Sequence, residues 1–334
     1  MDLLPKDRPK IVLYYPKLSP YKRTIRAPLP LIAIATLLAK EDFNIVIVSD
    51  SLHDDPMQKV LEEVQGNDTL CLGISALTGY QITDGLKVAK LVRERRPRLP
   101  LVWGGWHPSM DTEGTMQSPL VDIVVRGQGE RTFQELIHAL AEGKSLAGIL
   151  GISYKDNKGV SNNPERPLED INNFPSYPYG LGLIDVERVL FSNEFGRRVI
   201  NYISSIGCTW ECGFCEISSV YKRRWMALDA ERMLEDVDRL VKDYKVDTIQ
   251  IEDAEFYINK ERARSFFEGL LRKDLKINLC NVAARVRDIL KWDDELWELM
   301  TRAGCRDLFV GAESGYQPAL DLMKKHLSVD ETLS

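Results

Sequence analysis

The sequence predicts an α/β protein in which a doubly wound, Rossmann- or flavodoxin-like sheet precedes part of a parallel β/α barrel. Short, nearly continuous apolar runs alternate with amphipathic helical segments, which is typical of parallel strands covered on both faces. A stretch rich in Pro, Asn and Gly interrupts this alternation near the middle of the chain. The length of 334 residues is sufficient for two domains, each with its own core.

The first domain is predicted over residues 1–143. Helical patterns lie between its strand-like runs; one of them, ERTFQELIHALAEG, can end at Gly143. In an open sheet of this kind, a ligand is expected at the carboxyl ends of the strands. The strand-like runs are KIVLYYP (10–16), NIVIVSD (44–50), TLCLGIS (69–75), LPLVWGG (99–105) and VDIVVRG (121–127).

Residues 144–196 are predicted to connect the domains and to have little structure of their own. GISYKDNKGVSNN indicates a hairpin that turns between Asp156 and Gly159. The remainder, which includes PERPLEDINNFPSYPYGLG, lacks any helical or strand period.

The alternation resumes over residues 197–334. The strands expected there are RRVINYISSI, VDTIQIED, KINLCNVAA and RDLFVGAES, and each is followed by a loop or an amphipathic helix. The helix LDAERMLEDVDRLVKDY has Asp229 as its expected N-cap. A barrel cannot close with about four strands. We therefore expect the first four β/α units of a truncated barrel, completed from elsewhere or present as a fragment.

Composition limits the functional classes. A net charge of −6 argues against a nucleic-acid-binding surface over the whole molecule. Six cysteines in so long a chain do not predict a disulfide framework, and they favour a reducing, cytoplasmic setting. The most apolar run, residues 27–40, is too short to span a bilayer and predicts a buried helix.

Three of the cysteines, Cys208, Cys212 and Cys215, form a C-x3-C-x2-C cluster directly after a predicted strand. A structural zinc site would need a fourth thiolate, which Cys280 or Cys305 could supply, and coincidence is a further alternative. A [4Fe–4S] cluster held by three thiolates would instead leave one iron open to another ligand. In a β/α barrel, a loop in this position faces the catalytic rim.

The segment IGCTWECGFC closely resembles the signature of the radical S-adenosylmethionine (SAM) superfamily. The resemblance implies a [4Fe–4S] cluster on the three cysteines, SAM bound at the open iron, and Phe214 near the adenine. Further SAM contacts are implied at the ends of later strands, with an exposed loop as the alternative for Glu252 and Asp253 and a surface ion pair as the alternative for Arg285. They are Glu252 and Asp253 in IEDAEF, Arg285 in NVAARVRD, and Gly311, Glu313 and Ser314 in FVGAESG.

Loops of the first domain resemble those of cobalamin-binding domains, so the whole pattern is similar to the cobalamin-binding radical SAM family. The implied cobalamin contacts are Ser75, Leu77, Gly104, Gly105, His107 and Gly127. Glycines would let a flat corrin approach the backbone. The DxHxxG motif, whose histidine coordinates cobalt from below in many such domains, is absent after the first strand. Cobalamin is therefore expected without a lower axial histidine.

The resemblance implies an enzyme that methylates an unactivated carbon of a small molecule, using a 5′-deoxyadenosyl radical and methylcobalamin. An electron donor such as flavodoxin or ferredoxin would be its partner. Two alternatives remain open: a cyclase or rearrangement enzyme that uses the same cofactors, like the anaerobic porphyrin cyclases, and a non-catalytic cobalamin-binding module or partner subunit. The family resemblance assigns no residue a directly catalytic role and names no substrate.

Overall fold

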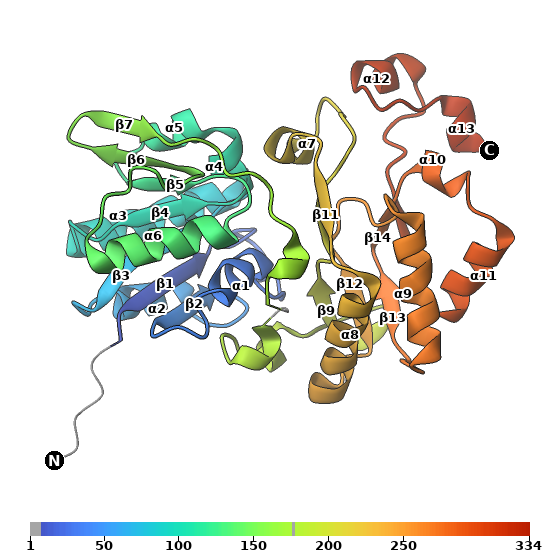
Figure 1. Cartoon of the computed structure of the whole chain (residues 1–334), viewed down its shortest axis with the longest axis horizontal. Helices are drawn as coiled ribbons and strands as arrows, with labels where there is room; N and C mark the ends of the chain where they lie inside the picture. Colours follow the sequence, from blue (N-terminus) through green and yellow to red (C-terminus); the bar gives the residue numbers. More distant parts are fainter. Residues whose placement is uncertain (1–7, 176–177) are drawn as a thin grey trace. The chain divides into compact units, whose positions relative to one another are not determined.

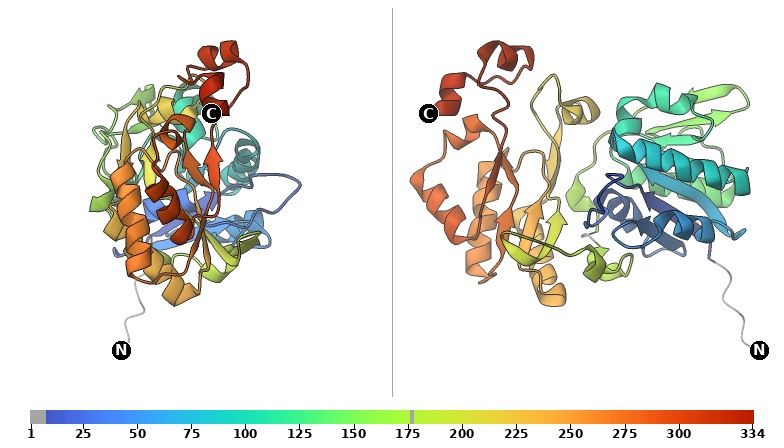
Figure 2. Two further views of the ribbon diagram at one scale, coloured as in Figure 1. Left: turned by 90° about the vertical axis from the view of Figure 1, so that its right-hand side faces the viewer. Right: turned by 180° about the vertical axis from the view of Figure 1, so that it is seen from behind.

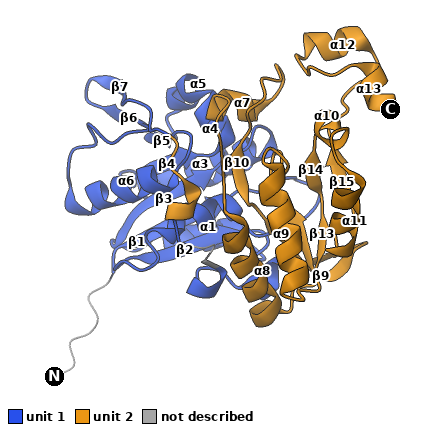
Figure 3. Cartoon of the chain, turned by 45° about the vertical axis from the view of Figure 1, so that its right-hand side comes forward, with its two compact units in different colours: residues 1–167, 174–189 blue, residues 168–173, 190–334 orange. Residues whose placement is uncertain are grey.

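A computed structural model describes residues 8–175 and 178–334. The chain divides into two compact units (Figure 3), each of which is described by itself. Unit 1 comprises the described residues up to Pro167 together with Phe174–Val189, and unit 2 comprises Leu168–Asn173 and Leu190–Ser334.

Unit 1 contains a seven-stranded sheet in the order β2-β1-β3-β4-β5-β6-β7. The first five strands in this order are parallel, as the sequence predicts, and the last two are antiparallel. The strand order reverses between β1 and β3, which makes this the topological switch point. The strands are β1 (Lys10–Tyr15), β2 (Asn44–Ser49), β3 (Thr69–Ser75), β4 (Leu101–Gly104), β5 (Ile123–Val125), β6 (Ile152–Asp156) and β7 (Gly159–Asn162).

Helices cover both faces of this sheet (Figures 1 and 2). The helices α1 and α6 contact each other, as do α2 and α3. The apolar run at residues 27–40 forms the buried α1, as expected. No helix within the described part of the chain is long and apolar enough to cross a membrane. The helices are α1 (Leu29–Thr36), α2 (Pro56–Glu63), α3 (Tyr80–Arg95), α4 (Trp106–Met110), α5 (Thr112–Gln117) and α6 (Glu130–Glu142).

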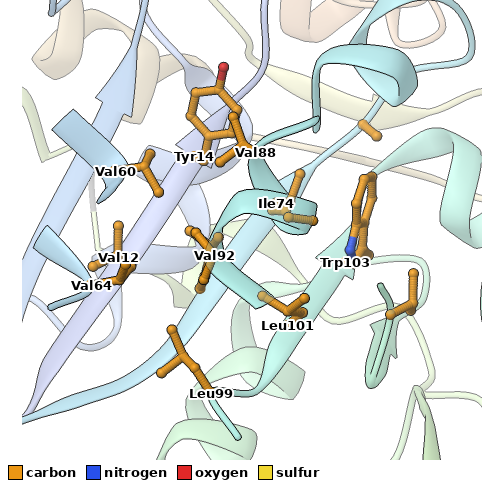
Figure 4. Packing of buried hydrophobic residues seen from close by; sticks show 14 of the residues in the cluster. Val12, Tyr14, Val60, Val64, Ile74, Val88, Val92, Leu99, Leu101 and Trp103 are labelled. Carbon is orange, nitrogen blue, oxygen red and sulfur yellow. The ribbon is translucent and has the colours of Figure 1, made fainter. Parts of the chain in front are cut away.

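One apolar cluster of unit 1 lies where α2 and α3 pack on β1, β3 and β4 (Figure 4). Val12, Val92 and Leu101 are completely buried in it. Burial of each such side chain stabilises the fold by about 1.5–3 kcal/mol. The core therefore fixes the strands, and with them the loops at their carboxyl ends.

The prediction that residues 144–196 have little structure of their own is wrong. The expected hairpin forms, but β6 pairs with β5 and so extends the sheet. Ile152 and Ser153 are fully buried. Their burial at the start of β6 stabilises the pairing of this strand with β5. Beyond it lie the 3-10 helices η1 (Ile171–Asn173), η2 (Pro178–Leu181) and η3 (Val186–Val189), then β8 (Phe191–Asn193). Residues 176 and 177 of this segment lie outside the described residues.

Unit 2 follows the predicted alternation of strands and helices. β9, β12 and β13 are adjacent and parallel, β14 and β15 form a second parallel pair, and β8 joins β9 in antiparallel fashion. Two predicted strands are each split, into β9 and β10 and into β13 and β14. The strands are β9 (Gly196–Tyr202), β10 (Ser205–Gly207), β11 (Trp225–Ala227), β12 (Thr248–Ile251), β13 (Asn278–Cys280), β14 (Val282–Ala284) and β15 (Leu308–Val310).

The helices of unit 2 include three amphipathic helices, α8, α9 and α11, at the predicted positions. The helix predicted from Gln317 ends at Leu322, because Lys324 and His326 adopt positive φ angles of 53° that no α-helix can contain. The helices are α7 (Glu216–Tyr221), α8 (Ala230–Tyr244), α9 (Lys260–Arg272), α10 (Val286–Ile289), α11 (Asp294–Arg302), α12 (Gln317–Leu322) and α13 (Val329–Leu333).

Candidate functional site

The three clustered cysteines lie on one loop between β10 and β11 of unit 2. These two strands pair in antiparallel fashion and hold both ends of the loop. Gly207 ends β10 with a φ angle of 79°, and a Cβ there would lie 2.1 Å from the carbonyl oxygen of Arg224. Only glycine is therefore compatible with the backbone at the end of β10. This conformation of Gly207 fixes the position of the next residue, Cys208.

The far end of the cysteine loop is a tight turn that leads into α7. The N–H of Cys215 donates to the carbonyl oxygen of Cys212 at 3.1 Å. The Ser218 hydroxyl donates to the carbonyl oxygen of Cys215 at 2.9 Å. Cys212 is buried, whereas Cys208 and Cys215 are half-buried. Phe214, between the last two cysteines, is 55% exposed and free to contact a ligand.

Arg285 follows β14 and lies against the cysteine loop. Its Nη1 is 3.6 Å from Cys212 Sγ, and its guanidinium carbon is 3.8 Å from the centroid of the Trp210 ring. Nη2 donates to the carbonyl oxygen of Lys325 at 2.6 Å. Nε is buried and has no partner among the residues that the structure describes. A buried guanidinium with a spare donor can bind an anionic or polar group. Within the described part of the chain, Arg285 is 7% exposed and forms no ion pair with a carboxylate.

Asp253 has a different environment from the one expected for a ligand contact. Its carboxylate is buried and accepts hydrogen bonds from the N–H and hydroxyl of both Ser204 and Ser205, at 2.6–3.1 Å. A carboxylate can accept about four hydrogen bonds, so these four donors leave Asp253 no acceptor site for a ligand. Asp253 therefore ties the end of β12 to the junction between β9 and β10.

The other carboxylates of the IEDAEF segment differ in burial. Glu252 is half-buried and accepts a hydrogen bond from Gln250 at 2.9 Å. Glu255 is only 2% exposed and accepts one from the N–H of Tyr257. Burial raises the pKa of Glu255 to about 8, against the opposing effect of that N–H and of nearby Arg285 and Lys325. This carboxyl is therefore mostly protonated at neutral pH and can donate a hydrogen bond.

The segment after β15 carries the predicted residues Gly311, Glu313 and Ser314. A Cβ at Gly311 would lie 2.8 Å from Lys325 Nζ and 2.9 Å from Glu313 Oε1, so a side chain there would meet the Glu313–Lys325 pair. Those two atoms form an ion pair of 2.7 Å, in which the Lys325 side chain is 7% exposed. The Ser314 hydroxyl accepts a hydrogen bond from the N–H of Tyr316.

The turn that contains Lys325 also contacts the cysteine loop. The N–H of Gly213 donates to the carbonyl oxygen of Met323 at 2.8 Å. His326 Nε2 lies 3.1 Å from Glu211 Oε1. Together with Arg285, these contacts bring the cysteine loop, the end of β14 and the segment after β15 into one site.

The zinc alternative needs a fourth thiolate close to the cysteine loop. Among residues 8–175 and 178–334, no three or more His, Cys, Asp or Glu side chains gather around one metal position, and this holds for the three clustered cysteines as well. Burial raises the pKa of Cys280 to about 11, so it is a neutral thiol, and its Sγ contacts Asn193. Burial, Glu255 and Cys215 raise the pKa of Cys208, against the Trp210 N–H and Arg285. Three cysteines on one loop, with Arg285 against Cys212, are the residue types that an anionic iron–sulfur cluster requires.

In unit 1, the predicted cobalamin residues gather at the carboxyl ends of β3, β4 and β5. The N–H of Ala76 donates to the carbonyl oxygen of Gly104 at 2.9 Å, and the N–H of His107 donates to that of Ala76. Gly105 has φ and ψ angles of 96° and −167°, a region that is almost exclusive to glycine. A Cβ there would lie 3.0–3.1 Å from atoms of Ala76 and Ser75.

The remaining predicted contacts of unit 1 complete this edge. His107 Nδ1 lies 3.3 Å from the Thr78 hydroxyl. Gly127 has a φ angle of 68°, faces open space where a Cβ would be, and donates its N–H to Ser109 at 2.9 Å. Leu77 donates its N–H to Gln81 Oε1 at 2.8 Å. The edge thus combines glycines and backbone groups with short or neutral polar side chains.

Sequence reasoning missed four residues of these sites. Glu255 lies in a segment that was singled out, but nothing in the sequence distinguishes it from the two acidic residues before it. Trp210 lies inside the cysteine motif, where an aromatic residue that stacks on Arg285 could have been expected. Gly207 precedes the motif. Lys325 gives no sequence signal, because only the turn after α12 brings it back to Glu313.

Comparisons with known families agree with this division of the chain. Residues 25–137 match the model of the B12 binding domain, and residues 202–334 match that of the radical SAM superfamily. The chain is 30% identical over 329 residues to an uncharacterized methyltransferase of Pyrococcus horikoshii, covering 97% of this chain and 70% of that protein. It is 27% identical to the anaerobic magnesium-protoporphyrin IX monomethyl ester cyclase of Rubrivivax gelatinosus, covering 89% and 54% of the two chains.

The fold also matches a solved structure. The cobalamin-dependent S-adenosylmethionine radical enzyme OxsB, with aqua-cobalamin and S-adenosylmethionine bound, superposes with a TM-score of 0.78 at 21% identity. The match covers 98% of this chain and 47% of that one. The chain thus spans about half the length of OxsB and of the Rubrivivax cyclase.

Proposed function

Because the chain belongs to the cobalamin-binding radical SAM family, we propose that it takes part in the methylation of an unactivated carbon of a small molecule, with a [4Fe–4S] cluster, SAM and cobalamin as cofactors. The observation that carries this proposal is the cysteine loop, which holds three thiols in one short segment and places one of them, Cys212 Sγ, 3.6 Å from a buried arginine with a spare donor. The methyltransferase relative, covered over most of its length, supports methylation as the reaction.

In this proposal, Cys208, Cys212 and Cys215 hold the cluster, and Arg285 offsets part of the negative charge of the thiolates. When bound, the cofactors supply an electron, a carbon-centred radical and a methyl group, which is chemistry that no side chain can provide. The protein itself would bind the cofactors and the substrate, orient them and exclude water from the site.

The SAM contacts that we propose are Phe214, Glu252, Arg285, Gly311, Glu313 and Ser314. To these we add Lys325 and Glu255, while Asp253 acts as a positioning residue. Arg285 and Lys325 supply cationic donors for a carboxylate, and Glu255 supplies a protonated carboxyl. Phe214 offers an exposed ring for stacking.

Ser75, Leu77, Gly104, Gly105, His107 and Gly127 are the proposed cobalamin contacts. The backbone character of this edge supports them, because a flat ring can approach glycines closely. The loop after β1 carries Pro16, Lys17 and Leu18 and has no imidazole, so we propose cobalamin without a histidine ligand below cobalt. Reductive SAM cleavage also needs an external one-electron donor, for which a flavodoxin or ferredoxin is the proposed partner.

The test begins with anaerobic reconstitution with iron and sulfide. We expect about four irons per chain and, with a reductant, cleavage of SAM to 5′-deoxyadenosine. Cys212→Ala should lose both, whereas Cys280→Ala, which alters a buried cysteine elsewhere in unit 2, should retain the iron. Copurifying zinc without SAM cleavage would contradict the proposal, and cobalamin binding without SAM cleavage would favour a non-catalytic binding module.

Cyclisation is the second candidate reaction, and the identity to the Rubrivivax cyclase is the observation in its favour. The two reactions differ in what happens to the methyl group. Over several turnovers with SAM that carries an isotopically labelled methyl group, label in the product would establish methylation. Product that carries no label would establish cyclisation or rearrangement.

A further inference from the structure

Two polar residues of α3 are buried beneath the loops that follow β1 and β3. Gln81 is 2% exposed, and its Nε2 donates to the carbonyl oxygen of Pro16 at 2.7 Å while its Oε1 accepts from the N–H of Leu77 at 2.8 Å. Asp84 is 9% exposed and accepts from the N–H of Lys17 at 3.0 Å. One turn of helix thus holds the backbone of two separate loops.

Tyr14 completes this network from the core. Its ring packs among the apolar residues of unit 1, and its hydroxyl points out of the cluster (Figure 4) and donates to Asp84 Oδ2 at 2.5 Å. Burial, reinforced by Asp84, raises the pKa of this hydroxyl far above its ordinary value, so it remains a donor at every accessible pH. Asp84 Oδ2 therefore receives two permanent donors and is fixed in one orientation.

The position of these loops indicates what the network is for. β1 and β3 are the neighbouring strands between which the strand order reverses. In doubly wound sheets, the ligand crevice opens at this point, outside the carboxyl ends of the strands. Buried polar side chains are costly unless they are hydrogen-bonded. Here the hydrogen bonds are used to join the two loops that flank the crevice.

We propose that Gln81 and Asp84 are positioning residues that hold the loop after β1 as a fixed, non-coordinating wall of the cobalamin site. This inference rests on the proposed function, and it assigns to α3 a role that the loop sequence alone does not reveal. A loop without an imidazole cannot be anchored by a bond to cobalt. Its anchor is instead the amide and the carboxylate beneath it, which bind its backbone at Pro16 and Lys17.

The test compares Asp84→Ala with Asp122→Ala in the full chain. Asp122 is the matched control, because it also accepts one backbone N–H, from Leu101 at 2.7 Å, and one side-chain donor, from Arg93 at 2.6 Å. Asp122 precedes β5 and contacts the first residue of β4, so it lies at the amino ends of these strands, away from the candidate cobalamin site at their carboxyl ends. Cobalamin affinity is measured for each, and the cob(II)alamin EPR spectrum is recorded with and without added imidazole.

We expect Asp84→Ala to bind cobalamin about tenfold more weakly, as is typical when a buried hydrogen-bonded group is removed. We also expect its released loop to admit imidazole, visible as nitrogen superhyperfine splitting that is absent from the wild type and from Asp122→Ala. Should Asp84→Ala not fold, Tyr14→Phe removes one donor at nearly constant volume and should change both readouts in the same direction.

Two results would overturn the inference. If Asp84→Ala and Asp122→Ala match in affinity and both exclude imidazole, α3 has no positioning role while the proposed function stands. If the wild-type chain binds no cobalamin at all, the proposed cobalamin chemistry fails and the inference fails with it.

Discussion

In unit 1, the candidate cobalamin edge is rich in glycines and backbone amides and has neutral side chains, whereas the candidate SAM site of unit 2 contains several buried ionisable side chains. Gly105 and Gly127 adopt positive φ angles at the ends of β4 and β5. Arg285, Lys325 and Glu255 are each less than 8% exposed in unit 2. The two candidate sites therefore differ in the groups that they offer to a ligand.

This difference teaches where each site is vulnerable. An edge formed by backbone tolerates little added volume, because the approaching surface already lacks side chains. A site formed by buried charge tolerates little loss, because removing one partner leaves another unpaired in a low-dielectric environment. Substitutions should therefore act in unit 1 by adding atoms and in unit 2 by removing or altering charge.

The largest effect is expected for Arg285→Lys. Lysine retains the charge but cannot supply the guanidinium fork that reaches Cys212, the Lys325 carbonyl and a ligand together. Loss of charged hydrogen bonds costs about 1.5–3 kcal/mol, so the Kd for SAM of the reconstituted protein should rise about 10–100-fold. Equilibrium dialysis with SAM measures it.

Arg287→Lys is the matched control for this change. It lies two positions along the chain, is 39% exposed and pairs with Glu331 at 2.8 Å. Exposed pairs contribute about 0–1 kcal/mol, and this one does not touch the cysteine loop, so the Kd for SAM should stay within about twofold of the wild-type value. Equal losses in the two variants would contradict the role that we give to Arg285.

The next effect is expected for Gly105→Ala. A Cβ at this position must adopt a glycine-only conformation and approach Ala76 and Ser75 at about 3.0 Å. Such strain costs about 1–3 kcal/mol, and relief by moving the loop would displace the edge. Cobalamin affinity should therefore fall together with the Tm.

Gly148→Ala separates the effect of backbone strain from the effect of the close approach to Ala76 and Ser75. Gly148 has a similar φ angle of 91°, but nothing lies within 4 Å of its ideal Cβ. It should lower the Tm by strain alone and leave cobalamin binding unchanged. If Gly148→Ala weakens cobalamin binding as much as Gly105→Ala does, the close approach at Gly105 has no part in binding.

The fold and the cysteine site were predictable from the sequence for physical reasons. Buried parallel strands are continuous apolar runs, as in Val12 and its neighbours, and these patterns are local. The cysteines were predictable because their spacing lies within a single loop. The hairpin of β6 and β7 was recognised, but its pairing with β5 depends on which edge is free, and the sequence does not encode this locally.

The rest of the site depends on contacts between distant segments. Lys325 approaches Glu313 only because the chain turns back after α12, and the two positive φ angles of that turn occur at ordinary residues. Asp253 and Glu255 are two positions apart, yet one is consumed by Ser204 and Ser205 while the other faces Arg285 and Lys325 in the site. Both carboxyls are buried, so what distinguishes them is the set of donors that the packed fold brings to each.

The last effect concerns stability rather than ligand binding, and it is the pH dependence that we expect through Glu255. Its pKa is raised by burial to about 8 in the folded protein, above the ordinary value of 4.5 that applies to the unfolded chain. Between these values the folded state holds a proton that the unfolded state has lost, so the free energy of unfolding falls as pH rises. The slope is at most about 1.4 kcal/mol per pH unit for a single group.

Glu255→Gln removes this titration while keeping the side-chain shape and a hydrogen-bond donor. Unfolding by urea is measured for the cluster-free chain at about pH 5.5, 6.5 and 7.5, which lie between the unfolded and folded pKa values. The stability of the wild type should decline relative to that of the variant as the pH rises. Below the unfolded pKa, where both proteins carry a neutral side chain, the difference between them should no longer change with pH. A constant difference across this window would mean that the Glu255 carboxylate is already ionised in the folded state, paired with Arg285 or Lys325. The cationic side chains of unit 2 would then be neutralised by a carboxylate of the protein itself. They would no longer differ from the edge of unit 1 by offering unpaired charge to a ligand.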